Sequence, residues 1–187
     1  MDSISLAYWY KPKYAFTIDY GQRPAEAEIA ASSKVASLLK IHHEIIKVDC
    51  SDLGRGDLSN KPPSNLSKSE WWPYRNQLLI TLACMKAISL DLEISEIIVA
   101  SVKGDTRHKD GTKGFYKKIN DLMHYQEGKI RVLYPVISKS TEDLIRDSKI
   151  PLSILLWAHS CHTSNTPCGD CPGCRKYLYV LRKLKLD

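Results

Sequence analysis

Hydrophobic positions along the chain alternate between short apolar runs and segments with helical spacing. The run at 14–20 is apolar and rich in β-formers, and Pro24 then opens a segment with apolar residues at helical spacing. Strand–helix–strand alternation predicts an α/β fold with a doubly wound parallel sheet, whose ligands bind beyond the carboxyl ends of the strands. The remaining predicted elements are strands over 44–49, 96–101 and 129–136, and a helix over 76–90.

Two segments depart from this alternation. Residues 1–9 have the pattern of a helix, with no strand before it. Residues 51–73 are longer than an ordinary connection and end in aromatic residues that run straight into a helix, which favours a functional lid. Arg75, in the first turn of that helix, opposes the helix dipole, so a nearby anion would relieve the conflict. The alternative is an exposed arginine paired with a carboxylate.

Composition indicates a folded protein. The chain has 187 residues, of which 43% are hydrophobic and 26% charged, and this excludes disordered and collagen-like classes. Apolar runs fall short of the roughly 20 residues that span a bilayer, and charged residues interrupt the first twenty positions. We therefore expect a cytoplasmic protein with no membrane partner.

The net charge of +6 is unevenly distributed. Residues 103–118 carry six Lys or Arg and two Asp, net +4, and residues 161–187 carry five and two, net +3. Each segment is either a solvated face or a site for an anion such as a nucleotide or nucleic acid.

Four of the six cysteines lie in one short segment. Its turns are supplied by Gly169, Pro172 and Gly173, and its four thiols fit tetrahedral zinc. Disulfides conflict with a cytoplasmic chain, and an iron–sulfur cluster would also accept four thiolates. With four thiolate ligands no position stays open for a catalytic water, so the metal is expected to be structural. The predicted ligands are Cys161, Cys168, Cys171 and Cys174.

Other residues near these ligands have plainer interpretations. His162 is a conceivable substitute ligand, but a solvent-facing neighbour is the simpler interpretation beside a complete four-cysteine set. Cys50 and Cys84 are interpreted as buried small hydrophobes. We expect one domain over 1–187, with a zinc knuckle and a C-terminal helix over 160–187.

Several motifs in order along the chain resemble one family. These motifs are Met1-Asp2-Ser3, Asp19-Tyr-Gly-Gln-Arg23, Pro73-Tyr-Arg75-Asn76, residues 101–105, Ser160-Cys161, Cys168, Cys171 and Cys174. The knuckle and the 19–23 turn are specific in combination. On these motifs the chain resembles the 7-cyano-7-deazaguanine synthase (QueC-like) family of PP-loop ATPases.

The resemblance implies an adenine nucleotide alpha-hydrolase-like fold and a ligase. Such an enzyme uses ATP to activate the carboxylate of 7-carboxy-7-deazaguanine for ammonia addition, and a second activation dehydrates the resulting amide to the nitrile, a step toward queuosine. Carried over by motif, Arg75, Asn76 and Asp105 belong to the substrate pocket. Those assigned to ATP and magnesium are Asp2, Ser3 and Asp19, while Gln22 and Arg23 could serve either side.

The sequence departs from the family pattern in two places. The phosphate loop Ser-Gly-Gly-x-Asp-Ser is matched only by Asp2 and Ser3, so we expect a longer natural chain whose first, central strand is missing here. Between Asp105 and Tyr116 the family's Pro-Asp-x-Arg element is replaced, and Pro24 stands where the family usually has His. These changes resemble a branch found in antiviral (CBASS-type) defence operons, where the deazaguanine is coupled to another macromolecule.

Two further functions compete with the synthase. A zinc-ribbon nucleic-acid-binding module would use the two basic segments, but an aromatic stacking run beside them is missing. A tRNA thiolase of the same superfamily would need reactive cysteines rather than cysteines held on zinc. The sequence leaves open whether the chain forms a homodimer.

Overall fold

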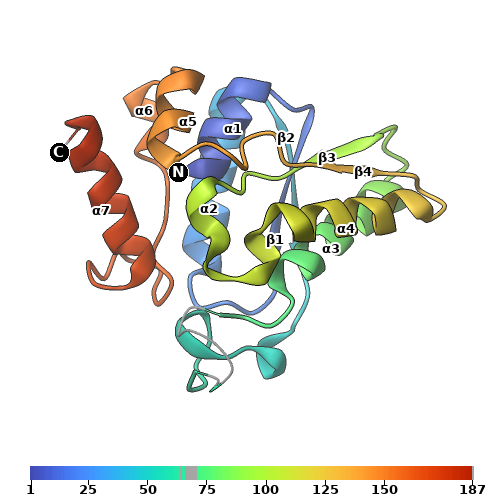
Figure 1. The fold of residues 1–187 in the computed structure, drawn as a ribbon, viewed down its shortest axis with the longest axis horizontal. Helices are drawn as coiled ribbons and strands as arrows, with labels where there is room; N and C mark the ends of the chain where they lie inside the picture. The colour runs from blue at the N-terminus through green and yellow to red at the C-terminus, as the bar shows by residue number, and fades with distance from the viewer. Residues whose placement is uncertain (64, 66–70, 187) are drawn as a thin grey trace. The chain divides into compact units, whose positions relative to one another are not determined.

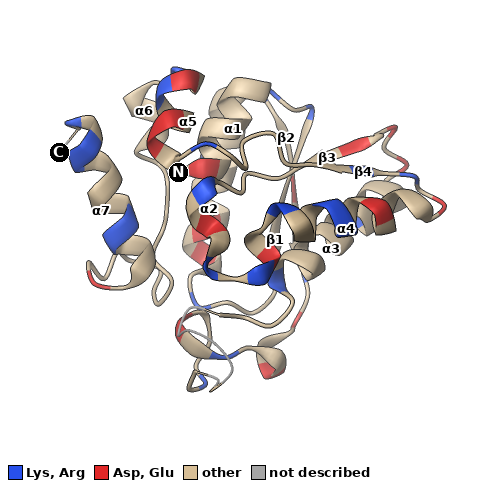
Figure 2. Ribbon diagram, viewed as in Figure 1, with Lys and Arg blue, Asp and Glu red and all other residues tan. Residues whose placement is uncertain are grey.

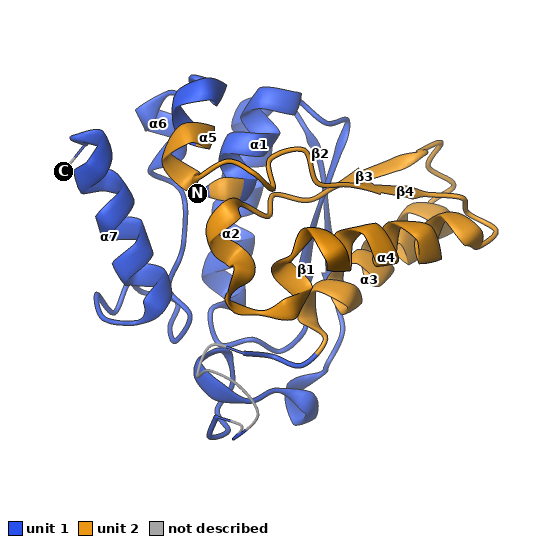
Figure 3. Ribbon diagram, in the orientation of Figure 1, with its two compact units in different colours: residues 1, 3–73, 145–187 blue, residues 2, 74–144 orange. Residues whose placement is uncertain are grey.

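The computed structural model describes residues 1–63, 65 and 71–186 (Figure 1). These residues divide into two compact units, which Figure 3 distinguishes by colour. Unit 1 contains residues 3–73 and 145–187 together with Met1, and unit 2 contains residues 74–144 together with Asp2.

Unit 1 is built on a parallel pair of strands. Strand β1 (Tyr14–Asp19) pairs with β2 (His42–Lys47), with Tyr14 opposite His42 and Asp19 opposite Lys47. Helix α2 connects the two strands and packs against both, because a parallel pair needs a crossover connection. The helices of this unit are α1 (Asp2–Tyr10, from Ser3 onward), α2 (Ala25–Leu39), α6 (Leu152–Leu155) and α7 (Pro172–Leu184).

A second core in unit 1 joins the two ends of the described chain. Ile145, Ile150, Leu155 and Val180 are buried together, and Ile4 and Tyr8 of α1 pack against them. Val180 lies on the buried face of helix α7, and the charged residues of this helix lie on its exposed face.

Unit 2 repeats the strand–helix–strand arrangement. Strand β3 (Glu96–Ile98) pairs in parallel with β4 (Arg131–Leu133), and Ile97 lies opposite Val132. A core of buried side chains is shared by α3 (Arg75–Ser89), α4 (Lys113–Tyr125) and the strands. Helix α5 (Thr141–Ser148) begins in this unit. The core residues are Ile80, Cys84, Tyr116, Ile119, Met123, Ile130 and Val132.

The prediction of an α/β fold with parallel strands is confirmed. Among the described residues, the strands form two separate two-stranded sheets, β1–β2 and β3–β4. The second strand begins two residues earlier than its apolar run, because His42 contacts the Tyr14 ring and His43 bonds Thr17 of β1. No helix in residues 1–63, 65 and 71–186 is both long and apolar enough to cross a membrane.

The described part of the long connection packs against the end of β1. It forms two short 3₁₀ turns, η1 (Ser51–Leu53) and η2 (Gly56–Leu58). Trp72 is 2% exposed, and its ring lies edge-on to Tyr20 at a centroid distance of 4.8 Å. The Leu58 carbonyl accepts a hydrogen bond from the Arg23 amide. Residues 64 and 66–70 of the expected lid lie outside the described residues.

Candidate functional site

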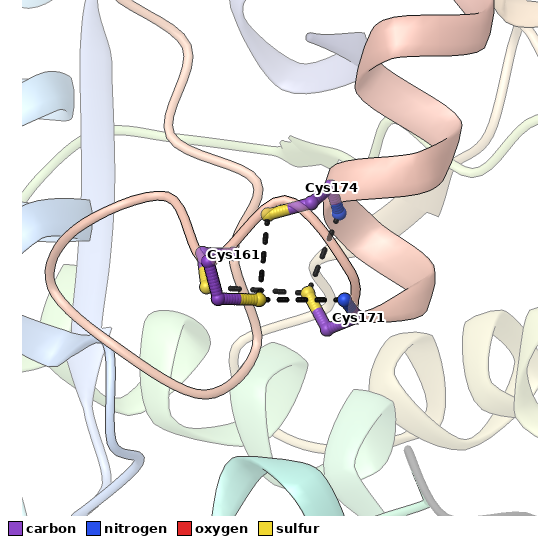
Figure 4. Close-up of side chains that lie close together, drawn as sticks. Cys161, Cys171 and Cys174 are labelled. Carbon is purple, nitrogen blue, oxygen red and sulfur yellow. Dashed lines mark hydrogen bonds between the residues drawn. The ribbon is translucent and has the colours of Figure 1, made fainter.

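The four predicted metal ligands lie together in unit 1. The Sγ atoms of Cys161, Cys168, Cys171 and Cys174 all lie within 4.8 Å of one another. Figure 4 shows Cys171 and Cys174 at the start of α7, with Cys161 reaching them from the preceding loop. The Cys168–Cys174 and Cys161–Cys171 sulfur pairs are each separated by 3.9 Å.

Backbone amides support the sulfur atoms. The Cys171 thiol accepts hydrogen bonds from the amides of His162 and Cys174, and the Cys168 thiol accepts one from the Cys171 amide. Hydrogen bonds, led by the Thr163 hydroxyl, lower the pKa of Cys168 to about 6. Burial raises the pKa of Cys174 to about 12.

The spacing of the thiols fits a single tetrahedral ion. With metal–sulfur bonds of about 2.3 Å, a tetrahedron places its thiolates about 3.8 Å apart, close to the two sulfur pairs at 3.9 Å. A cubane cluster would hold its four cysteines on separate iron atoms and so spread the sulfur atoms by its own width. The donor set therefore favours a mononuclear site with no open position.

His162 is not part of the four-sulfur set. It is half-buried, and its ring lies over Gly173, where a Cβ would overlap the imidazole and the Ser160 carbonyl. Gly173 is thus required for the close approach of the two segments that carry the ligands. Of the two remaining cysteines, Cys84 lies in the unit 2 core, where burial raises its pKa to about 11. Cys50 is half-buried.

The predicted nucleotide residues Asp19, Gln22 and Arg23 lie in one turn at the carboxyl end of β1. The Asp19 carboxylate accepts a hydrogen bond from the Gly21 amide, and Arg23 is exposed. Gln22 is 3% exposed, and its side-chain amide makes hydrogen bonds within the turn, to β1 and to α2. Its oxygen accepts from the Tyr20 amide, and its nitrogen donates to the Ile18 carbonyl and the Glu28 carboxylate.

The predicted substrate residues Arg75, Asn76 and Asp105 all belong to unit 2, and Arg75 and Asp105 lie near enough to Tyr116 for their charges to act on its phenol. Burial raises the pKa of Tyr116, and the charges of Asp110, Asp105 and Arg75 all act on its phenol. That phenol is 2.5 Å from the buried hydroxyl of Ser101. The Asp105 carboxylate accepts from the Val102 amide, which shapes the turn η3 (Lys103–Arg107).

Asp110, which sequence reasoning did not single out, holds Asn76 in place. Its carboxylate accepts from the Asn76 amide at 3.3 Å, and its carbonyl accepts from the Asn76 side chain at 2.9 Å. Asp110 belongs to the turn η4 (Lys109–Gly111), inside the basic segment 103–118. The net positive charge of this segment gives no sign of the role of a single carboxylate within it. Figure 2 shows the Lys and Arg residues along α4 and a second group of Lys and Arg along α7.

The other two predicted residues open helix α1. Asp2 is in its first turn, and Ser3 is exposed there. The predicted site residues thus form three local groups: the four cysteines, the residues of the 19–23 turn and the residues of unit 2. Asp2 and Ser3 belong to none of these groups and lie at the start of α1.

Together, parallel strands and a C-terminal four-sulfur site define an α/β protein with a metal-binding cysteine knuckle. The family model described as "Queuosine biosynthesis protein QueC" matches residues 1–184. The chain belongs to this family.

Several curated relatives are named 7-cyano-7-deazaguanine synthases. The chain is 25% identical to the 7-cyano-7-deazaguanine synthase of Methanocaldococcus jannaschii, over 87% of this chain and 80% of that protein. It is also 25% identical to 7-cyano-7-deazaguanine synthase 1 of Desulfitobacterium hafniense, over 93% of this chain and 84% of that protein.

A solved structure supports the fold. The U34-tRNA thiolase NcsA from Methanococcus maripaludis, determined with its [4Fe-4S] cluster, matches with a TM-score of 0.50 and 14% identity. The match covers 98% of this chain but 62% of that one. At this identity the likeness concerns the fold alone.

Proposed function

We propose that the protein is an ATP-dependent ligase of the 7-cyano-7-deazaguanine synthase type. The observation that carries this proposal is the family match over residues 1–184, which includes every residue assigned to the site. The charges of Arg75 and Asp105, which act on one buried tyrosine, and the hydrogen bonds that join Asn76 to Asp110 support it, because the motif match assigns these three residues to one substrate pocket.

The proposed reaction converts a carboxylate into a nitrile in two activations. Reaction of the 7-carboxy-7-deazaguanine carboxylate with ATP releases pyrophosphate and gives an acyl-adenylate. Ammonia displaces AMP, which carries away one carboxylate oxygen, and the amide forms. A second ATP activates the amide oxygen, and its loss with AMP leaves the nitrile. The protein's task is positioning and charge stabilisation rather than nucleophilic attack.

On the substrate side, Arg75 would bind the carboxylate. It lies in the first turn of α3 and is half-buried, so its charge is less screened than that of an exposed arginine. Asn76, held by Asp110, would present its amide to a polar edge of the deazapurine. Asp105 would complete the pocket as an acceptor for the donor groups of a guanine-like ring.

For the nucleotide, we assign Asp19 of unit 1 to ATP and magnesium. Asp2 and Ser3 carry the same assignment from the motif match alone. Asp19 ends a parallel strand, the usual place for nucleotide ligands, and its carboxylate is an oxygen ligand of the kind magnesium prefers. Arg23 is exposed and would contact phosphate. Gln22 contributes by fixing the turn that carries its neighbours, since its amide is used internally.

We further propose that the four cysteines hold one structural zinc ion. The spacing of their sulfur atoms supports a single ion, and the ion would supply cross-linking of the 161–174 segment rather than chemistry. Elemental analysis should find one zinc per chain, and the visible spectrum should lack iron–sulfur absorption. Stoichiometric iron with that absorption would overturn the zinc proposal.

The test of the proposed function is ATP-dependent conversion of 7-carboxy-7-deazaguanine with ammonia. We expect the nitrile and AMP, and an at least hundredfold loss of kcat/KM in Arg75→Ala, because removing a charged partner of a carboxylate costs about 3 kcal/mol or more. The matched control is Arg131→Ala, an exposed arginine of unit 2 that pairs with Glu96. Salt-sensitive RNA binding without ATP turnover would instead support the nucleic-acid-binding module.

The acceptor is tested in the same assay. We propose the free nitrile as product, and recovery of it by chromatography supports this. If the deazaguanine were recovered attached to a protein or nucleic acid in an ATP-dependent reaction, the defence-type coupling would replace it.

A further inference from the structure

Helix α2 begins without a capping side chain of its own. Its N-cap residue is Pro24, which offers no side-chain acceptor, although the first turn of every helix leaves backbone amides to be satisfied. The Ala27 amide instead donates to the side-chain oxygen of Asn165 at 3.2 Å. The Asn165 side-chain nitrogen donates to the Glu26 carboxylate at 2.9 Å. One side chain, distant in sequence, therefore satisfies two groups in the first turn of α2.

Asn165 lies on the loop between two metal ligands, Cys161 and Cys168. This loop is stabilised at its base, where the Ser164 carbonyl lies 3.0 Å from the His159 ring nitrogen. Because both ends of the loop lie in the sulfur cluster, a bound ion would close it and restrict the positions that Asn165 can reach. Without the ion, the loop would sample more conformations and the cap would be made less often.

The first turn of α2 is in turn bonded to the turn at residues 19–23. The Ala25 amide donates to the Gln22 carbonyl, and the Glu28 carboxylate accepts from the Gln22 side chain at 2.8 Å. Hydrogen bonds therefore join the cysteine loop to the first turn of α2, and others join that same helical turn to the turn that carries Asp19 and Arg23. All of these residues belong to unit 1.

We propose that Asn165 is a positioning residue that makes the start of α2, and with it the 19–23 turn, depend on metal occupancy of the cysteine cluster. The metal is structural for the knuckle, and through Asn165 it also orders the 19–23 turn, which is bonded to the first turn of α2. This proposal rests on the metal occupancy proposed above and not on the reaction. Coupling of this kind is reciprocal, so the cap must also strengthen metal binding.

The test compares metal-loaded wild-type protein with Asn165→Ala. Asn165 is exposed, so this substitution removes the cap without opening a cavity. We expect hydrogen exchange of the Ala27 amide to accelerate about fivefold, as for loss of one helix cap. By reciprocity, zinc affinity should fall by up to the same factor, measured by competition with a chelator of known affinity.

Thr166→Ala is the matched control. Thr166 is on the same loop and exposed, and its hydroxyl pairs with the hydroxyl of Ser164 rather than with α2. We expect wild-type exchange at Ala27 and wild-type zinc affinity in this variant.

Two results would overturn the proposal. Unchanged exchange at Ala27 in Asn165→Ala would show that the cap is not made in solution. Faster exchange with unchanged zinc affinity would show a cap that is independent of the metal. Either result is separable from failure of the proposed function, because turnover of 7-carboxy-7-deazaguanine is measured independently of both.

Discussion

Asp110 caps the start of α3, which lacks a capping side chain at its own N-cap residue. The N-cap residue Tyr74 has a left-handed backbone (φ 56°) and no side-chain cap, and Arg75 places a positive charge where the helix dipole is unfavourable to it. The Asp110 carboxylate supplies both an acceptor for the Asn76 amide and a negative charge close to that end. The anion expected near Arg75 is therefore partly provided by the protein itself.

Replacing Asp110 with alanine tests this role. We expect a loss of about 1 kcal/mol in the free energy of unfolding, since a helix cap is removed, measured by urea denaturation. We also expect kcat/KM for the proposed reaction to fall about tenfold, because Asn76 loses one of its two anchors. Asp121→Ala, an exposed carboxylate of α4, is the control. Wild-type stability in Asp110→Ala would contradict the capping role.

His43 ties three elements of unit 1 together. Its ring nitrogens lie 2.8 Å from the Thr17 hydroxyl of β1 and 3.2 Å from the Ser33 hydroxyl of α2. Burial lowers the pKa of His43 below its ordinary value of 6.5, and the neighbouring Glu44 carboxylate opposes this shift.

The lowered pKa of His43 predicts acid sensitivity. Below about pH 6.5 the unfolded chain binds a proton at His43 more readily than the folded chain, so the free energy of unfolding should decrease as the pH falls from 7 toward 5. His43→Gln should flatten this dependence, as measured by denaturation at several pH values. His42→Gln, at the exposed neighbouring position, should keep the wild-type slope. An equal slope in His43→Gln would assign the acid sensitivity to other groups.

At the scale of elements, the sequence predicts structure that depends on one segment but not contacts between segments. The helix following Pro24 and the cysteine knuckle follow from local spacing, and the structure contains both. Strand β2 begins at His42 rather than at the predicted residue 44, because His42 and His43 are polar in sequence yet contact partners on β1 and α2. Polar residues that are satisfied by another element carry no hydrophobic signal.

Substitution of Gly54 tests whether the described part of the long connection is closely packed around Trp72. A Cβ at this position would overlap the ring of Trp72, which is buried against Tyr20. We expect Gly54→Ala to lower the free energy of unfolding by about 1–3 kcal/mol, the usual cost of overpacking, and to increase Trp72 fluorescence quenching by acrylamide. Gly114→Ala, in open space on α4, should be neutral or stabilising. Wild-type behaviour of Gly54→Ala would mean that Trp72 is not held there in solution.

At the scale of the molecule, the sequence predicted the α/β class, the family and the metal ligands, because these depend on short motifs in order. It could not predict Asp110 with Asn76, or Asn165 with Ala27, because each pair joins residues far apart in the chain. Hydrogen-bond partners across a fold leave no periodic trace in one sequence. For Gln22, the motif predicts a binding residue, but it does not predict the hydrogen bonds that the Gln22 side chain makes within the fold.

Metal removal should affect unit 1 first. The four cysteines belong to this unit, and the Cys171 thiol caps α7 through the Cys174 amide. We expect chelation to release one zinc and to lower the melting temperature by roughly 5–10 °C, corresponding to a loss of a few kcal/mol. Hydrogen exchange should rise in α7 before it rises in α3 and α4. An unchanged melting temperature after complete metal release would contradict a structural role.

The parallel pairing within each unit has a consequence for how the chain folds. Strands β1 and β2 are joined through α2 alone, and β3 and β4 are joined through the segment that contains α4. Each pair therefore closes a loop of modest length, and the entropic barrier to forming it is set by that loop. Two folding nuclei can form independently, so refolding is expected to begin at two places in the chain at once.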